Sequence, residues 1–176
     1  RREAFVREAM RSAKGFAAML AAFALMALFW VLYAEGFYFG FMELGSFANP
    51  AGTLLIGVLF AAAVAAFSLM VTFALGSNHQ STPLVILTSA PCVFLAGCIY
   101  PAGSFAPWAA AVSKLFPSTA GINGMLAASQ NGAATGAVLP WALHLALLTV
   151  IYGAAALALA RWRGARLDRG EPPPSD

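Results

Sequence analysis

Four long apolar runs dominate the pattern of residues along this chain of 176 amino acids. They cover about residues 15–34, 51–75, 83–100 and 139–160. An α-helix rises about 1.5 Å per residue, so a run of roughly 20 residues crosses a hydrocarbon core about 30 Å thick. The pattern therefore predicts an all-α, polytopic membrane protein with four transmembrane helices.

A different pattern precedes the last run. Pro101, Pro107 and Pro117 divide residues 101–138 into apolar pieces that are too short to cross a bilayer. Two short helices are expected there, over about residues 105–116 and 119–129. We interpret them as a re-entrant or interfacial helical hairpin on the outer side, placed before the last transmembrane helix.

The two ends of the chain are basic. Residues 1–14 predict a short cytoplasmic amphipathic segment, which is either a solvated extension or a helix lying at the membrane interface. Residues 161–176 are expected to form a cytoplasmic basic tail, with a disordered end around its prolines. The domain between them, residues 15–160, holds all the expected spans.

Charged residues are almost confined to those ends. Nine of the ten Lys and Arg residues lie within residues 1–14 and 161–169, and between residues 15 and 160 the charged side chains are Glu35, Glu43 and Lys114. A soluble protein needs charge spread over its surface, which excludes that class. Basic residues beside apolar runs mark the cytoplasmic side, so both termini are predicted to be cytoplasmic. The expected localisation is the bacterial cytoplasmic (inner) membrane, and no nucleic-acid partner is expected.

No catalytic motif is present in the sequence. It lacks the phosphate-binding pattern GxxxxGK[ST], the zinc pattern HExxH and the nucleophile pattern GxSxG. We therefore expect no enzyme activity, no cofactor and no metal site in this chain. Cys92 and Cys98 are six residues apart, which places them on different faces of one helix, so they are interpreted as packing residues.

Three polar side chains in the apolar region allow two interpretations each. His144, near the outer end of the last run, is expected to hydrogen-bond a neighbour or interfacial water, and the alternative is a functional site. Glu35 and Glu43 are expected at the outer interface, where a carboxylate costs little. Attraction of a cation or a substrate is the alternative for both.

Three proline-centred segments carry a resemblance to a known family. They are residues 89–101 (SAPCVFLAGCIYP), 105–108 (FAPW) and 115–119 (LFPST). In this order they resemble the permease subunit of ABC-2 type exporters, whose pattern reads PxxxLSGxxxP, MPxW and LxPxT. Residues 49–53 (NPAGT) and the pair at 132–133 (GA) are also similar to the family. Ala96, Ala106 and Asn123 stand where the family usually has Ser, Met and Arg.

The resemblance implies a six-span half-transporter of which this chain holds the last four spans. Such a permease forms the substrate pathway as a dimer, with a second copy or a paralogue, and a separate ABC ATPase (nucleotide-binding) subunit drives it. Membrane lipids and a periplasmic adaptor protein are further expected partners, and the expected substrate is drug-like, lipid-like or otherwise amphiphilic. The alternative function is a non-transporting membrane scaffold or assembly subunit.

The resemblance also assigns two groups of residues by position. The expected outer re-entrant gate consists of Gly97, Pro101, Pro107, Trp108 and Pro117. The expected ATPase-contact face consists of Phe5, Arg7, Arg11, Asn78 and His79.

Overall fold

The computed structural model describes residues 12–39, 41, 48–75, 86–87, 90–97 and 105–168. Within these residues all regular structure is helical, and three helices are long and apolar enough to cross a membrane. These are α2 (Ala13–Leu32), which continues into the π-helical stretch η1 (Tyr33–Phe39), α3 (Pro50–Leu75) and α7 (Thr135–Asp168). The prediction of an all-helical protein with membrane-spanning helices is confirmed for these three.

The expected span over residues 83–100 is described only in part. Residues 86–87 and Ala90–Leu95 are helical, and a turn follows at Ala96–Gly97. Gly97 has a φ of +87°, the left-handed conformation that commonly ends a helix and that glycine adopts without strain. The other residues of this range lie outside the described part of the chain.

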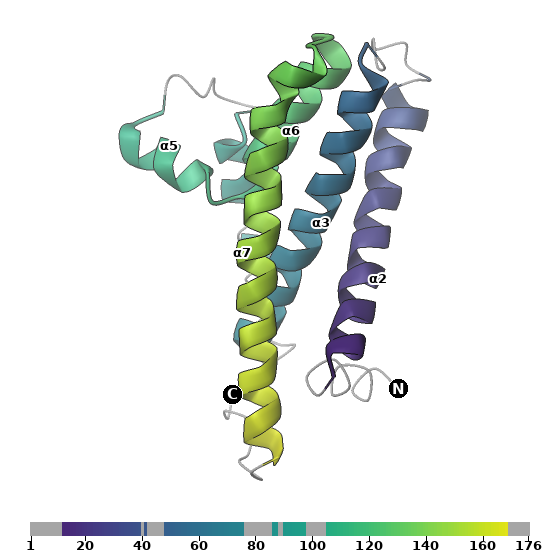
Figure 1. Cartoon of the computed structure of the whole chain (residues 1–176). Helices are drawn as coiled ribbons and strands as arrows, with labels where there is room; N and C mark the ends of the chain where they lie inside the picture. Colours follow the sequence, from purple (N-terminus) through teal and green to yellow (C-terminus); the bar gives the residue numbers. More distant parts are fainter. Residues whose placement is uncertain are drawn as a thin grey trace.

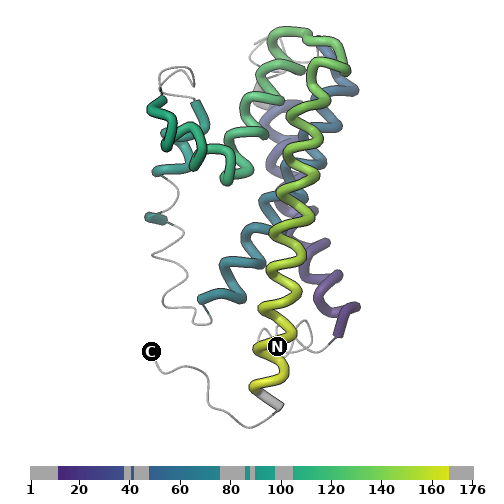
Figure 2. The backbone as a smooth tube through the Cα atoms, turned by 60° about the vertical axis from the view of Figure 1, so that its left-hand side comes forward, coloured from purple at the N-terminus to yellow at the C-terminus, as the bar shows by residue number. Residues whose placement is uncertain are grey.

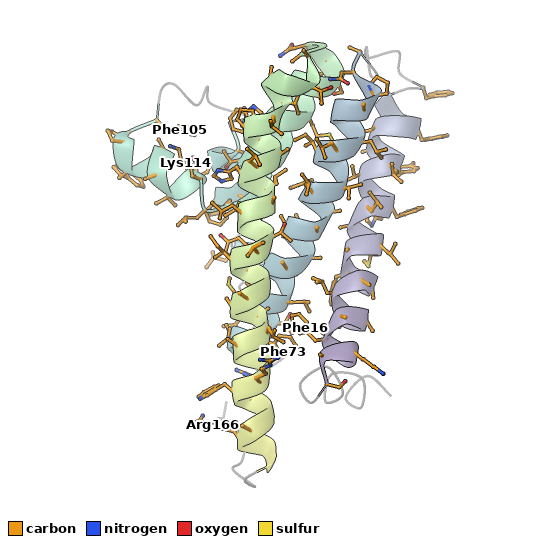
Figure 3. All side chains as sticks on the ribbon, in the orientation of Figure 1. Phe16, Phe73, Phe105, Lys114 and Arg166 are labelled. Carbon is orange, nitrogen blue, oxygen red and sulfur yellow. The ribbon has the colours of Figure 1, made fainter. Side chains whose placement is uncertain are left out.

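The long helix α3 packs against both α2 and α7 (Figure 1). The start of α2 and the ends of α3 and α7 meet at one end of the bundle. There the Phe16 ring stacks on Phe73, with ring centroids 6.3 Å apart (Figure 3). Lys14 and the arginines of α7 also belong to this end, which we call the basic end. The end of α2 and the starts of α3 and α7 form the opposite, far end.

Small side chains allow this close packing along α3. Ala61, Ala63, Ala65 and Ala66 are all buried, and small residues let helix backbones approach each other in a membrane. At the basic end Phe16 and Phe73 join a buried cluster with Leu69 of α3 and small residues of α7. Other apolar side chains, such as Leu25 and Met26 of α2, are exposed, as hydrocarbon-facing positions should be.

Helix α7 is longer than the apolar run that predicted it. It includes Arg161–Asp168, so this part of the expected basic tail is the last two turns of a helix. Hydropathy marks where apolar residues end, whereas the helix continues through Arg, Trp, Ala and Leu, all of which a helix accommodates. The remaining residues of the expected tail, 169–176, and residues 1–11 lie outside the described part.

Two short helices lie between α3 and α7 in the sequence. They are α5 (Pro107–Ser113) and α6 (Pro117–Met125), and α6 continues into the π-helical stretch η3 (Leu126–Gln130). Figure 2 shows that α5 projects away from the bundle while α6 and η3 rise to the far end and join α7 there. The second short helix was expected from residue 119, but it begins at Pro117, because proline fits the first turn of a helix.

Candidate functional site

The short helices α5 and α6 are joined by a tight turn, in the segment where the sequence predicted a re-entrant or interfacial hairpin. Pro107 and Pro117 occupy the first turns of the two helices, where the missing N–H of proline costs nothing. Between the helices, the Leu115 N–H donates to the Val112 carbonyl at 3.0 Å and the Phe116 N–H to the Ser113 carbonyl at 3.1 Å. We call residues 114–116 the hairpin corner.

Two side chains of α7 bond the backbone of the hairpin corner. His144 Nε2 lies 2.8 Å from the carbonyl oxygen of Lys114, and the hydroxyl of Tyr152 donates to the carbonyl oxygen of Leu115. A carbonyl oxygen only accepts, so His144 carries a proton on Nε2 in this contact. These bonds satisfy carbonyls at the end of α5, where no later helical turn supplies a donor.

The hairpin corner lies beside the middle of α7. From Thr135, the start of α7, His144 is about 14 Å along the helix axis and Tyr152 about 25 Å. Arg161, the first charged residue of α7, is another 14 Å or so beyond Tyr152. The corner is therefore far from both ends of the apolar part of α7, with Lys114 on the side of the bundle where α5 projects (Figure 3).

Polar side chains of α6 bond the helical turn at residues 90–97. Ser118 Oγ donates to the Cys92 carbonyl at 3.3 Å, Thr119 Oγ1 to the Leu95 carbonyl at 3.3 Å, and Asn123 Nδ2 to the Ala96 carbonyl at 3.1 Å. The Cys92 carbonyl also accepts from the Ala96 N–H at 3.1 Å, whereas the Leu95 and Ala96 carbonyls lie at the end of the helical turn, where the helix offers few donors. The three contacts fix α6 and residues 90–97 as one unit.

Asn49 joins three elements at the far end. Its Oδ1 accepts from the Gly52 N–H at 3.0 Å, which caps the start of α3. Its Nδ2 donates to the Ala133 carbonyl at 2.8 Å, just before α7, and its backbone N–H donates to the Ala128 carbonyl of η3 at 3.2 Å.

Two glycines of α6 allow it to lie directly on its neighbours. A Cβ at Gly121 would come within 2.4 Å of the Phe60 ring of α3, and a Cβ at Gly124 within 3.0 Å of Ile56. Real Cβ atoms essentially never lie this close to a neighbour, so any other residue at Gly121 would require Phe60 to shift. This close approach also shapes the wall of the cavity described next.

A cavity of about 470 Å³ lies among α2 with η1, α6 with η3, α3 and the turn at residues 96–97. Its walls are mostly apolar. The residues that matter for its chemistry and shape are Glu35, Phe60, Gly97, Asn123, Ser129 and Gln130.

Glu35 is the acidic side chain of this cavity. It lies in η1, where the π-helical turn alters the direction in which side chains leave the helix. Ser129 lines the same cavity and its hydroxyl donates to the Met125 carbonyl at 2.9 Å, while Glu35 Oε2 is buried and has no hydrogen-bond partner. Among the described residues no group of three or more His, Cys, Asp or Glu side chains could hold a metal ion.

The comparison with known families is decisive. The family described as ABC-2 family transporter protein matches residues 10–158 of this chain. The chain belongs to the ABC-2 family of transporter proteins. It is therefore a multi-pass membrane protein and a membrane permease of an ABC transporter, as the proline-centred segments indicated. No curated protein and no solved structure matches it.

The described gate residues of this ABC-2 permease come from three elements of the structure. Gly97 lines the cavity, and Pro117 is buried at the start of α6, which bonds the turn ending at Gly97. Pro107 and Trp108 begin α5, where Trp108 is 72% exposed. Pro101 lies outside the described residues, and so does the whole expected ATPase-contact face (Phe5, Arg7, Arg11, Asn78 and His79).

Several polar residues of the permease form hydrogen bonds between helices that the sequence did not predict. Tyr152 and Ser118 drew no prediction, and Asn123 stood out only as a departure from the family pattern, yet all three bond main-chain carbonyls. The prediction that His144 hydrogen-bonds a neighbour is confirmed. Their common signal is a donor side chain in an apolar helix, which must find an acceptor within the protein.

Proposed function

We propose that this permease is an exporter subunit whose α5–α6 hairpin enters the membrane from the outer side and turns back at the hairpin corner. The position of that corner beside the middle of α7 is the observation that carries the proposal. Hydrogen bonds from α7 and α6 satisfy the ends of the short helices, which is the condition for interrupted helices at membrane depth.

A fourth crossing accounts for the chain between α3 and α5. Leu75 ends α3 at the basic end, whereas the turn at residues 90–97 and α6 are bonded together nearer the far end (Figure 1). A span over residues 83–100, as the apolar run predicts, would connect these two points. With four crossings, both termini lie on one side.

The basic end is the cytoplasmic end in this proposal. Lys14 at the start of α2 and Arg161, Arg163 and Arg166 at the end of α7 gather there. Cytoplasmic flanks of spans carry such an excess of Lys and Arg. The bacterial inner membrane, with the hairpin on the outer side, is the corresponding location.

The energy for export is assigned to a separate ATPase. The sequence contains no P-loop to hold a nucleotide, so ATP hydrolysis belongs to a partner subunit. That subunit would dock at the cytoplasmic side, on residues 1–14 and 77–81. A second permease copy or a paralogue would complete the pathway for an amphiphilic substrate, with a periplasmic adaptor as a further partner.

Cysteine labelling tests the proposal. A cysteine at Lys114, in the hairpin corner, is treated with a membrane-impermeant maleimide applied from outside to native membranes, with and without ATP and vanadate. We expect labelling from outside, at a rate that changes at least about threefold between the two states. A cysteine at Ala137, exposed at the far end, is the matched control with constant labelling.

Two results would oppose the proposal. Labelling of the Lys114 position from the cytoplasmic side alone would reverse the topology. If the labelling rate at position 114 does not change with ATP, and an ABC ATPase never co-purifies with the permease, a non-transporting scaffold would be favoured.

A further inference from the structure

Glu35 presents a carboxyl group to the cavity near the far end of the bundle. It lies within the membrane-spanning segment Ala13–Phe37, lines the 470 Å³ cavity, and has an oxygen, Oε2, that is buried without a hydrogen-bond partner. Glu35 is half-buried, and a carboxylate that is partly removed from water is stabilised by a cation placed beside it.

No described side chain supplies that cation. The residues that line the cavity include no Lys, Arg or His. Of the described basic residues, Lys14, Arg161, Arg163 and Arg166 belong to the basic end, whereas Glu35 is in the last part of the α2–η1 segment near the far end. Lys114 is on the side of α5, and in both views α5 projects away from α2 (Figures 1 and 2).

The apolar walls of the cavity favour an organic cation over a metal ion. Val31, Phe60, Ile122 and Met125 give apolar contact, and the aromatic ring of Phe60 can face a positive charge favourably. A bare metal ion needs several oxygen or nitrogen ligands, whereas an organic cation needs one countercharge and apolar surface for its body. A volume of about 470 Å³ is within the range of sites for drug-sized molecules.

We propose that this cavity binds a singly charged lipophilic organic cation, with Glu35 as its countercharge and the Phe60 side of the cavity against its apolar body. The inference rests on the proposed export function only in treating the cation as cargo. Binding to the cavity is a separate property that requires neither ATP nor the ATPase.

The test measures equilibrium binding without nucleotide. The intact permease in phosphatidylglycerol nanodiscs is titrated with tetraphenylphosphonium, a cation, and with tetraphenylborate, an anion of closely similar shape, with empty nanodiscs subtracted. For Glu35→Gln, which keeps the shape and removes the charge, we expect about tenfold or greater loss of affinity for the cation and no loss for the anion. Arg161→Gln, at the basic end, is the charge control and should leave the affinity for the cation unchanged.

A second variant tests the cavity itself. Ala34 lines it, so Ala34→Phe fills space while keeping the carboxylate, and the affinity for tetraphenylphosphonium should again fall about tenfold. This variant decides the matter if Glu35→Gln proves too unstable to purify. Cation affinity within twofold of wild type in either folded variant would overturn the proposal.

A change of lipid in the nanodiscs distinguishes two possible sources of the cation. An ammonium group could come from a soluble amphiphile or from a phosphatidylethanolamine headgroup, so the titration is repeated with phosphatidylethanolamine in the nanodiscs. Competition by that lipid assigns the site to the headgroup, and unchanged affinity assigns it to a soluble amphiphile. Normal binding combined with ATP-independent labelling of the Lys114 position would reject export while leaving the binding site intact.

Discussion

The hydroxyl of Tyr152, near the middle of α7, donates a hydrogen bond to the backbone carbonyl of Leu115 in the hairpin corner. Replacing Tyr152 with Phe keeps the ring and removes the donor. Because the carbonyl then loses its partner in an apolar region, we expect the free energy of unfolding to fall by about 0.5–2 kcal/mol. Thermal unfolding in lipid nanodiscs measures this. Tyr33→Phe, at a tyrosine that is 45% exposed, is the control, and equal losses in both variants would contradict the role of the bond.

Because Gly121 lies against Phe60, an alanine at position 121 should destabilise the protein, whereas an alanine at Gly153 should not. Gly121→Ala places a Cβ against the Phe60 ring and should cost about 1–3 kcal/mol. Gly153→Ala, in α7 with nothing within 4 Å of the new atom, should be neutral or stabilising by up to about 1 kcal/mol. Phe60→Leu should recover much of the loss in the double variant. A double-mutant cycle on unfolding free energies checks this, and strict additivity would argue against the contact.

Substitutions of Asn49 should destabilise the protein to different degrees, because its Oδ1 accepts one hydrogen bond and its Nδ2 donates another. Asn49→Asp keeps an oxygen to cap α3 through the Gly52 N–H but loses the donor to the Ala133 carbonyl. Asn49→Ala loses both, so we expect a loss of about 1–3 kcal/mol in unfolding free energy for Ala and roughly half of that for Asp. Chemical unfolding of the purified permease provides the measurement. If Asp and Ala were equally destabilising, the cap would contribute nothing.

Loss of Arg163 should destabilise the protein more than loss of Arg161, two residues earlier in α7. Its Nη2 donates to the Ala74 carbonyl at 3.0 Å, at the end of α3, where a cation is favoured by the helix dipole. Arg163→Gln should lower the unfolding free energy by about 0.5–1.5 kcal/mol, and Arg161→Gln, at an exposed position, by less than about 0.5 kcal/mol. Because both variants remove one positive charge, a difference in melting temperature isolates the contact. Identical melting temperatures would show that only net charge matters.

The spans were the most predictable part of the fold. The apolar run 51–75 corresponds to α3 at Pro50–Leu75, because Asn49 and Pro50 form a helix start that is legible in the sequence. The run ending at residue 160 predicted α7 less well, since hydropathy records the apolar part of the helix and not the helix itself. Helix α6 begins at Pro117, two residues before the expected start, because proline is well suited to the first position of a helix.

The site was less predictable because its contacts end on main-chain atoms. His144, Tyr152, Ser118 and Asn123 all bond carbonyl groups, and every residue has a carbonyl, so no residue pattern shows which ones will be reached. The cavity depends on the π-helical turn at Glu35 and on the approach of Gly121 to Phe60. Neither follows from periodicity, which assumes regular helices.

The bonds at the hairpin corner have a consequence for how the protein tolerates change. His144 and Tyr152 bind the carbonyls of residues 114 and 115, so the side chains at these two positions take no part in the attachment. Lys114 and Leu115 are also both exposed. We therefore expect substitutions at positions 114 and 115 to leave these two bonds in place, whereas substitutions that remove the donors of His144 and Tyr152 break them. In these two hydrogen bonds the identity of the donor residue matters, whereas the identity of the acceptor residue does not.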